Sequence, residues 1–355
     1  MSLKLVVIGA GGLVGIRVAE RLVQNKTFGT SPTQQLPLTS IVLMDLNDIS
    51  KQLPMSVTKD SRVRIVTGSL ADPTTMEEIL SPNEKGGKTY TRVTVIHLAA
   101  VLSGNAEDNF DLGMKINLYG TLSVLEVMRK ISAQLKQPQI YFFCSTDYVC
   151  AFIEKNKVSP VNEESFRLSP VSYGVQKACV ELLVSDYTRK GFLDGRVGRL
   201  SAVIGRPGFS NSISYPYTGI FTQPMLGKDY DVPLPMDILY PISCIDNNVA
   251  SILHLSSMVD SREIGHNRVV QIAAISVSLS HIWAATQSVA QELNIPLGKI
   301  RQVGSGGGGT TVTEINVCPR VDCEKARRLG CPMDVNLKDI IRQYARRYVL
   351  VKAKL

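Results

Sequence analysis

Short apolar runs alternate with amphipathic segments along most of the chain. The apolar runs predict buried strands of the parallel type at 3–8, 41–44, 63–68, 93–98, 139–144 and 195–204. Apolar residues at helical spacing predict helices at 16–23, 115–131 and 173–184, and Asp72-Pro73 is predicted to begin another. Strands that alternate with helices in this way indicate an α/β protein with a parallel sheet and crossover helices. The stretch 27–40 is polar, contains two Pro residues and is predicted to be a surface loop.

A glycine-rich turn joins the first predicted strand to the first predicted helix. Gly9, Gly12 and Gly15 stand in the strand, turn and helix context that a dinucleotide-binding fingerprint requires. The backbone N–H groups of such a turn approach a pyrophosphate at the helix N-terminus. Asp45 ends the next strand, where a carboxylate accepts from both ribose hydroxyls and repels the 2′-phosphate of NADP. NAD is therefore the predicted cofactor; a turn without a ligand and an ordinary capping Asp are the structural alternatives.

The character of the chain changes after Gly205. Residues 206–241 hold glycines and prolines among short polar stretches, as expected of a lobe that covers a cleft, and helix and strand patterns return at 244–258, 268–273 and 277–293. We predict a Rossmann-type, doubly wound parallel sheet at 1–205, which the chain rejoins at about 244–274. The segments 206–243 and 275–355 are predicted to form a smaller C-terminal substrate-binding lobe. The glycine run at 304–309 is predicted to be a flexible connector, because no Gly-Lys-Ser/Thr follows it.

One helix carries the candidate chemistry. Tyr173 and Lys177 lie four residues apart, so a helix places both on one face. A nearby cation favours the phenolate, lowers the Tyr pKa and makes the phenol a usable proton acceptor at neutral pH. A Tyr and a Lys at this spacing also occur by chance on partly exposed helix faces, so the assignment depends on the other motifs.

The composition of the chain argues against several classes of binding partner. Hydrophobic residues make up 44% and charged residues 20% of the 355, which is ordinary for a globular enzyme, and no apolar run reaches the ~18 residues of a membrane helix. The net charge of +8 is scattered and is not interleaved with aromatic residues, so we expect neither a nucleic-acid nor a membrane partner. The seven cysteines form no CxxC pair, which favours free thiols in a reducing compartment and predicts no metal site.

Taken together, the motifs resemble those of the extended short-chain dehydrogenases/reductases. The residues that carry the resemblance are Gly9, Gly12 and Gly15, His97-Leu98-Ala99-Ala100, Asn117, Ser145, and Tyr173 with Lys177. Longer strings at 101–113, 174–177, 186–196 and 206–208 are similar to the D-erythronate dehydrogenases of this family. The resemblance implies NAD-dependent oxidation of the C2 hydroxyl of a small sugar acid, with D-erythronate giving 2-oxo-erythronate. It also implies a homodimer formed through the helices near 115–131 and 173–189.

The resemblance implies a role for each site residue. Tyr173 is implied to be the base, Lys177 to lower its pKa and hold the nicotinamide ribose, and Asn117 to support a proton relay. Ser145 is implied to orient the reacting hydroxyl, with Thr146 as the alternative. The substrate pocket is implied to include Ser103, Gly104 and Arg206, whose guanidinium suits a carboxylate, although a surface Arg at a turn is an equal alternative. The implied cofactor contacts are Gly9, Gly12, Leu13, Val14, Gly15, Asp45, Ser69, Leu70, Leu98, Ala99, Ala100, Asn117, Tyr173 and Lys177.

Some positions depart from the family pattern, and two other functions stay open. Cys144 stands where relatives carry Ser, Val149-Cys150 replaces an aromatic-Gly pair, Ser69 replaces Asp, and Phe209 replaces the Lys of erythronate enzymes, which bears on the substrate. A sugar-nucleotide epimerase or dehydratase would share the fold and the Tyr-Lys pair. Its diphosphate ligand would favour more basic residues in 206–241 than Arg206 and Lys228. The third alternative is a non-catalytic NAD-binding interaction protein.

The last three residues suggest a cellular address. Ala353-Lys354-Leu355 resembles the Ser-Lys-Leu signal of peroxisomal proteins. We therefore expect recognition by the peroxisomal import receptor and a location in peroxisomes or glycosomes, with the cytoplasm as the alternative. The apolar strand that begins at Leu3 leaves no room for a signal peptide, in this interpretation.

Overall fold

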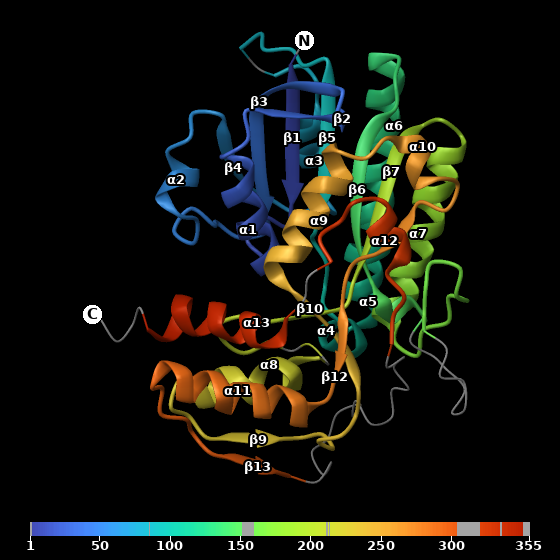
Figure 1. The fold of residues 1–355 in the computed structure, drawn as a ribbon. Coiled ribbons are helices and arrows are strands. Elements are labelled where there is room, and N and C mark those ends of the chain that lie inside the picture. The colour runs from blue at the N-terminus through green and yellow to red at the C-terminus, as the bar shows by residue number, and fades with distance from the viewer. Residues whose placement is uncertain are drawn as a thin grey trace.

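A computed structural model describes residues 2–84, 86–150, 160–210, 212, 214–303, 320–333 and 336–350. Its centre is an eight-stranded sheet with the order β11-β7-β6-β5-β1-β3-β2, in which β4 also pairs with β3 (Figure 1). Its strands are β1 (Leu3–Ile8), β2 (Thr27–Ser31), β3 (Gln34–Asp45), β4 (Val63–Thr67), β5 (Arg92–His97), β6 (Gln139–Thr146), β7 (Leu193–Leu200) and β11 (Val269–Gln271).

The central strands are buried on both faces. All six residues of β1 are buried, and β1 pairs in parallel with β3 and β5, with Leu5 opposite Ile41 and Thr94. A parallel sheet needs this composition because helices cover both of its faces. The parallel pairing brings the carboxyl ends of β1, β3, β5 and β6 to one edge of the sheet, where ligands bind in folds of this kind.

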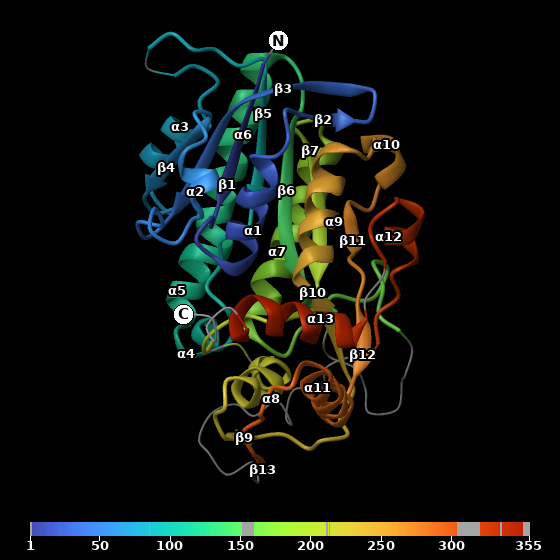
Figure 2. The same cartoon turned by 60° about the vertical axis from the view of Figure 1, so that its left-hand side comes forward.

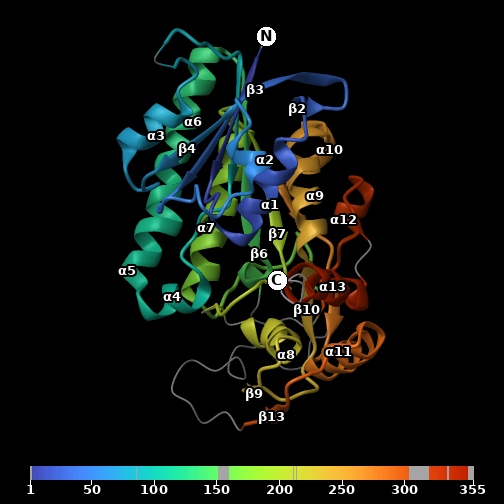
Figure 3. The same ribbon diagram turned by 90° about the vertical axis from the view of Figure 1, so that its left-hand side faces the viewer.

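Helices form a layer on each face of the sheet (Figure 3). On one face, α1 (Leu13–Leu22) and α9 (Ile245–Ser257) pack Val18, Leu22, Ile252 and Leu255 onto the sheet. On the other, α3 (Pro73–Leu80), α6 (Thr121–Leu135) and α7 (Ser172–Arg189) pack Met76, Met128 and Val184 against it. The shorter helices are α2 (Met55–Thr58), α4 (Ser103–Asp108), α5 (Phe110–Gly113), the π-helix η1 (Met114–Gly120), the 3-10 helix η2 (Asp147–Cys150), α10 (Ser261–Ile264) and α12 (Glu324–Arg328).

A smaller lobe lies beyond the carboxyl edge of the large sheet (Figures 1 and 2). It has its own core cluster, which includes Tyr217, Ile220, Phe221, Ile282 and Ile341. Its strands are β8 (Ala202–Ile204), β10 (Tyr240–Cys244) and β12 (Ile275–Val277) in one sheet, and β9 (Tyr230–Val232) with β13 (Ile300–Gln302) in another. Its helices are α8 (Tyr215–Met225), α11 (Leu279–Leu293), α13 (Leu337–Tyr344) and the π-helix η3 (Ala345–Val349).

Two predicted elements are wrong. The stretch 27–40 is not a loop: β2 and the first half of β3 form an antiparallel hairpin in which Phe28 pairs with Leu36 and is buried. Polar residues and Pro are accepted in this hairpin because it lies at the edge of the sheet. The single strand predicted at 195–204 is two strands, since β7 pairs with β6 in the large sheet and β8 pairs with β10 in the small one.

Some predictions fall on parts of the chain that the structure does not describe. The glycine connector 304–309, Cys318 and the tripeptide 353–355 lie outside the described residues. The import signal and its receptor therefore stay predictions. Within the described residues, no helix has the length and apolar character needed to cross a membrane, and no group of three or more His, Cys, Asp or Glu residues is placed to hold a metal ion.

Candidate active site

The glycine turn forms a tight cradle at the carboxyl end of β1. Gly9 has a φ of 88°, and a Cβ placed there would lie 2.5 Å from the backbone nitrogen of Ala99. A Cβ on Gly15 would lie 2.4 Å from the carbonyl oxygen of Gly9. Gly12 is the N-cap of α1 and offers no side-chain cap, so N–H groups at this helix N-terminus are left for a ligand. The turn therefore fits a dinucleotide pyrophosphate, with Leu13 and Val14 in the first turn of the helix.

Asp45 is held against this turn. It ends β3, and its Oδ2 accepts a hydrogen bond of 2.8 Å from the Gly11 N–H. The carboxylate thus lies beside the position of the adenosine ribose that the glycine cradle defines, where it accepts from hydroxyls and repels a phosphate. This placement is the one that the predicted preference for NAD over NADP requires.

The remaining predicted cofactor contacts follow the ends of two other strands. The N–H groups of Leu98 and Ala99 both donate to the Ile8 carbonyl, which holds the chain after β5 against the glycine turn. Leu70 follows β4, is buried, and lies so close to Gly120 that a Cβ there would approach its Cδ1 to 2.3 Å. Ser69 caps the turn at this point by accepting from the Ala71 N–H. Ala100 continues the segment after β5.

Asn117 fixes the segment that leads to the predicted substrate residues. Its amide accepts from the Val101 N–H and donates to both the Val101 carbonyl and the Gln176 Oε1, at 2.8, 3.0 and 2.8 Å. The side chain is buried within the π-helix η1, a distortion that is often found at functional sites. Ser103 and Gly104 begin α4 shortly after Val101, so Asn117 positions them through the backbone.

Tyr173 and Lys177 share one face of α7, as predicted. The Lys177 Nζ lies 5.7 Å from the centre of the Tyr173 ring and 4.3 Å from that of Phe143, and it donates to the Cys144 carbonyl at 2.8 Å. Burial lowers the pKa of Lys177 to about 8, against the opposing effects of Cys144 and Glu181. The ammonium group is therefore held at the end of β6, beside the phenol.

The expected lowering of the Tyr173 pKa by Lys177 is not observed in the protein alone. Burial raises the pKa of Tyr173 well above its usual value, Cys144, Asp147 and Tyr148 raise it further, and Arg206 opposes the rise. Desolvation of the phenolate outweighs the favourable charges at this position. A phenolate at Tyr173 therefore depends on the cations around it, and Arg206 is one of them.

Ser145 lies in a buried cluster of charged side chains that was not predicted from the sequence. Its hydroxyl donates to Glu181 Oε1 at 2.7 Å, and the same carboxylate is paired with Arg199 and Arg167 at 2.7 and 2.8 Å. Glu181 lies eight residues beyond Tyr173 on α7, or about 12 Å along the helix axis. The Ser145 proton is thus donated to Glu181 in this structure, and the role of Ser145 in orienting the reacting hydroxyl stays a prediction. Glu181 follows Lys177 at helical spacing, which is the signal that could have revealed this cluster.

Thr146 ends β6 and lies in a different hydrogen-bond network. Its Oγ1 accepts from the Tyr148 N–H at 3.2 Å and is 3.3 Å from Asp147 Oδ1, to which it donates. Asp147 was not among the predicted residues, although it follows Ser145 and Thr146 directly in the chain. Burial raises the pKa of Asp147 to about 7, against the opposing effects of Ser201, Thr146 and Arg199. The structure thus adds an acid to the site.

Arg206 enters the site from the small lobe, in the loop after β8. Burial lowers its pKa, whereas Tyr215 and Tyr173 oppose this shift, which places the guanidinium near both phenols. Its Nη1 donates to the Ser210 hydroxyl at 2.8 Å. Arg206 is therefore partly buried beside the catalytic candidate rather than an exposed turn residue. Phe209 is 80% exposed, but its ring packs edge-on against Tyr215, with 4.9 Å between the ring centres.

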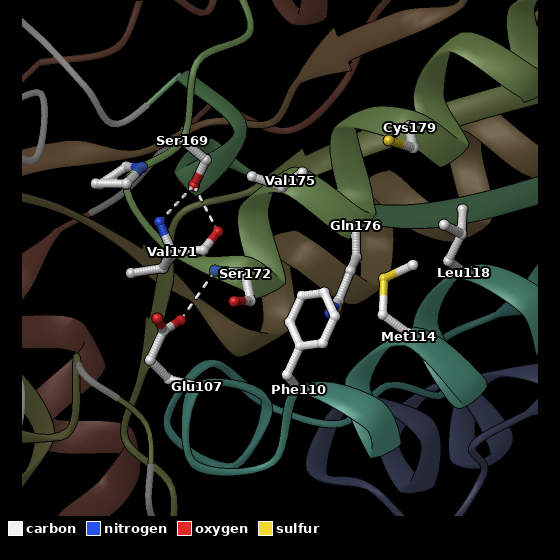
Figure 4. Close-up of a pocket in the computed structure, with 11 residues that line it drawn as sticks. Glu107, Phe110, Met114, Leu118, Ser169, Val171, Ser172, Val175, Gln176 and Cys179 are labelled. Atoms are coloured by element: carbon white, nitrogen blue, oxygen red, sulfur yellow. Dashed lines mark hydrogen bonds between the residues drawn. The ribbon is translucent and has the colours of Figure 1, made fainter.

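The opposite face of α7 borders a cavity (Figure 4). This cavity measures about 410 Å³ and lies between α5, η1 and the first half of α7. Its apolar lining includes Phe110, Met114, Leu118 and Val175. Tyr173 and Lys177 do not line it, because they occupy the other face of the helix. The cavity is therefore separate from the candidate active site.

Comparison with known proteins identifies the family of the chain. Residues 5–218 match the NAD dependent epimerase/dehydratase family. The chain is 32% identical over 294 residues to D-erythronate dehydrogenase of Cupriavidus necator, covering 81% of this chain and 82% of that protein. It is 27% identical over 346 residues to D-erythronate dehydrogenase of Haemophilus influenzae, covering 96% and 98%.

Solved structures share the fold along nearly the whole chain. A nucleoside-diphosphate-sugar epimerase of Agrobacterium tumefaciens superimposes with a TM-score of 0.81 at 25% identity, covering 98% of this chain and 95% of that one. An L-threonine 3-dehydrogenase of Trypanosoma brucei superimposes with a TM-score of 0.80 at 18% identity, covering 99% and 98%.

The fold and site define an NAD-dependent oxidoreductase of the extended short-chain dehydrogenase/reductase type. The chain belongs to the NAD dependent epimerase/dehydratase family and is an NAD-dependent dehydrogenase. This confirms the predicted fold class, family and cofactor.

Proposed function

We propose that the protein oxidises the C2 hydroxyl of a small sugar acid of the D-erythronate type to the 2-oxo acid. The observation that carries the proposal is the convergence of Tyr173, Lys177 and Arg206 at the carboxyl edge of the sheet. A hydride acceptor, a base and a cation for a carboxylate are what the oxidation of a 2-hydroxy acid needs. The likeness to two D-erythronate dehydrogenases supports the same substrate class.

Each residue has a defined task in this proposal. When bound, NAD supplies the acceptor for the hydride that leaves C2. Tyr173 takes the proton of the C2 hydroxyl as a phenolate, and the Lys177 ammonium, 5.7 Å from the centre of the Tyr173 ring, supplies a positive charge on the same helix face. Thr146, rather than Ser145, orients the hydroxyl, because the Ser145 hydroxyl is committed to Glu181. The guanidinium of Arg206 binds the substrate carboxylate.

The test is NADH formation by purified protein with NAD and D-erythronate, together with NADP and a panel of four- to six-carbon sugar acids. Tyr173→Phe should bind NAD and lose turnover by about 10²–10⁴-fold, since positioned proton transfer contributes that much. Arg206→Gln should raise KM for the acid more than it lowers kcat. Conversion of a nucleotide sugar with no net NADH formation would favour the epimerase instead. Binding of NAD without turnover of any acid would contradict the proposal.

We also propose that the protein is a homodimer. Phe110, Leu112, Tyr119, Val175 and Leu182 are 41–60% exposed and lie on α5, η1 and α7. Phe110 and Val175 of this set line the cavity of Figure 4. Apolar side chains gathered in this way favour coverage by another protein surface, and the family resemblance favours a second copy. Leu182→Glu should give a monomer in light scattering, whereas Phe166→Glu, which changes an exposed Phe elsewhere, should leave a dimer. A wild-type monomer would contradict the proposal.

A further inference from the structure

The direction of the hydrogen bond between Thr146 and Asp147 depends on whether Asp147 carries a proton. A hydroxyl has one proton to donate and can accept at two positions. The Thr146 oxygen accepts from the Tyr148 N–H, and its proton points to Asp147 Oδ1 when Asp147 is ionised. In that state Thr146 can only accept from a substrate hydroxyl. It would then compete with Tyr173 for the substrate proton instead of directing that proton to Tyr173.

A protonated Asp147 reverses this arrangement. Its O–H can donate to Thr146 across the same 3.3 Å. Thr146 then accepts from both Tyr148 N–H and Asp147, and its own proton becomes free to bind the substrate oxygen. Every donor and acceptor of the Thr146 hydroxyl is then used, and the substrate O–H is left pointing to the base.

The surroundings of Asp147 favour the protonated form. The side chain is 8% exposed, and its Oδ2 is a buried atom with no hydrogen-bond partner among the described residues. An ionised carboxylate in this position would lack the hydrogen bonds that a buried charge needs. Burial is the largest influence on Asp147, and the Ser201 hydroxyl just after β7 opposes it by stabilising the ionised form. The charged and titratable groups that act on Asp147 are Arg199 from β7, Tyr173 from α7, Tyr240 from β10, and Tyr148 and Cys150 from its own helix. Arg199 is the cation in this set, and it is paired with Glu181.

We propose that Asp147 is a positioning residue whose proton sets the direction of the Thr146 hydrogen bond, so that Thr146 donates to the C2 oxygen of the substrate. The inference rests on the proposed function, because it needs a reacting hydroxyl beside Thr146. The raised pKa of about 7 agrees with a proton that is held near neutral pH. Asp147 acts only through Thr146 and takes no part in the hydride or proton transfer.

The test compares the pH profiles of the wild type, Asp147→Asn and Asp147→Ala with NAD and a sugar acid. The Asn amide donates to Thr146 at every pH. The ratio of wild-type to Asp147→Asn kcat should therefore fall above about pH 7, by up to tenfold per pH unit. Asp147→Ala removes the carboxylate that would capture the Thr146 proton, so its kcat should not fall above about pH 7, and its KM should change little. Profiles of the same shape for the wild type and Asp147→Asn would overturn the inference.

Two further measurements distinguish failure of the inference about Asp147 from failure of the proposed function. Thr146→Ser should keep the wild-type pH profile, and Thr146→Val should lose kcat, because only the former retains the hydroxyl. Infrared difference spectra of the wild type against Asp147→Asn should show a protonated carboxyl band at pH 6, without any substrate; its absence would overturn the inference alone. If the protein binds NAD and oxidises no sugar acid, the proposed function fails and the inference fails with it.

Discussion

Replacing Asp147 by Asn should change how the stability of the protein depends on pH. Burial raises the pKa of this acid from 3.8 to about 7 in the folded protein. The unfolded chain therefore loses the proton more readily, and ionisation favours unfolding as pH rises from 3.8 through 7. The shift of about 3 pKa units corresponds to about 4 kcal/mol once pH exceeds 7. Asn cannot ionise, so the stability of the variant does not fall in this way as pH rises.

The comparison is best made between pH 5 and pH 8, where the linkage gives a change of about 2 to 3 kcal/mol in the stability difference between the two proteins. Urea unfolding at several pH values measures it, and titrating groups common to both proteins cancel. The free energy of unfolding of the variant should increase relative to that of the wild type as pH rises. Asp237→Asn, at an exposed position, should show no such trend. A stability difference for Asp147→Asn that is constant with pH would refute the reasoning.

Three other substitutions test the site. Ser145→Ala should lower the free energy of unfolding by about 1.5–3 kcal/mol, because a hydrogen bond to a charged group is lost, and should leave most turnover. Thr146→Val should lose turnover. Steady-state kinetics and urea unfolding check both variants. Asp45→Ala should raise the NADP-to-NAD ratio of kcat/KM, because the carboxylate no longer repels the 2′-phosphate. Gly9→Ala should abolish NAD binding in calorimetry, since its Cβ would approach the Ala99 nitrogen to 2.5 Å.

The sequence by itself determined the local elements that carry the cofactor. The glycine turn, the strand before it and Asp45 could be read directly because tight turns and buried parallel strands leave few residue choices. The same holds for Tyr173 and Lys177, whose spacing places them on one helix face in any context. The hairpin at 27–40 was missed because an edge strand does not need a continuous apolar pattern.

Tertiary structure decided which polar groups meet. Glu181 lies eight residues beyond Tyr173, Arg199 lies on another strand, and only packing of α7 against β6 and β7 brings both to Ser145. Packing of the two lobes also buries Asp147 and places Arg206, which belongs to the small lobe, near Tyr173. Hydrogen-bond direction and pKa depend on burial and on neighbours distant in the sequence, and spacing along the chain carries neither.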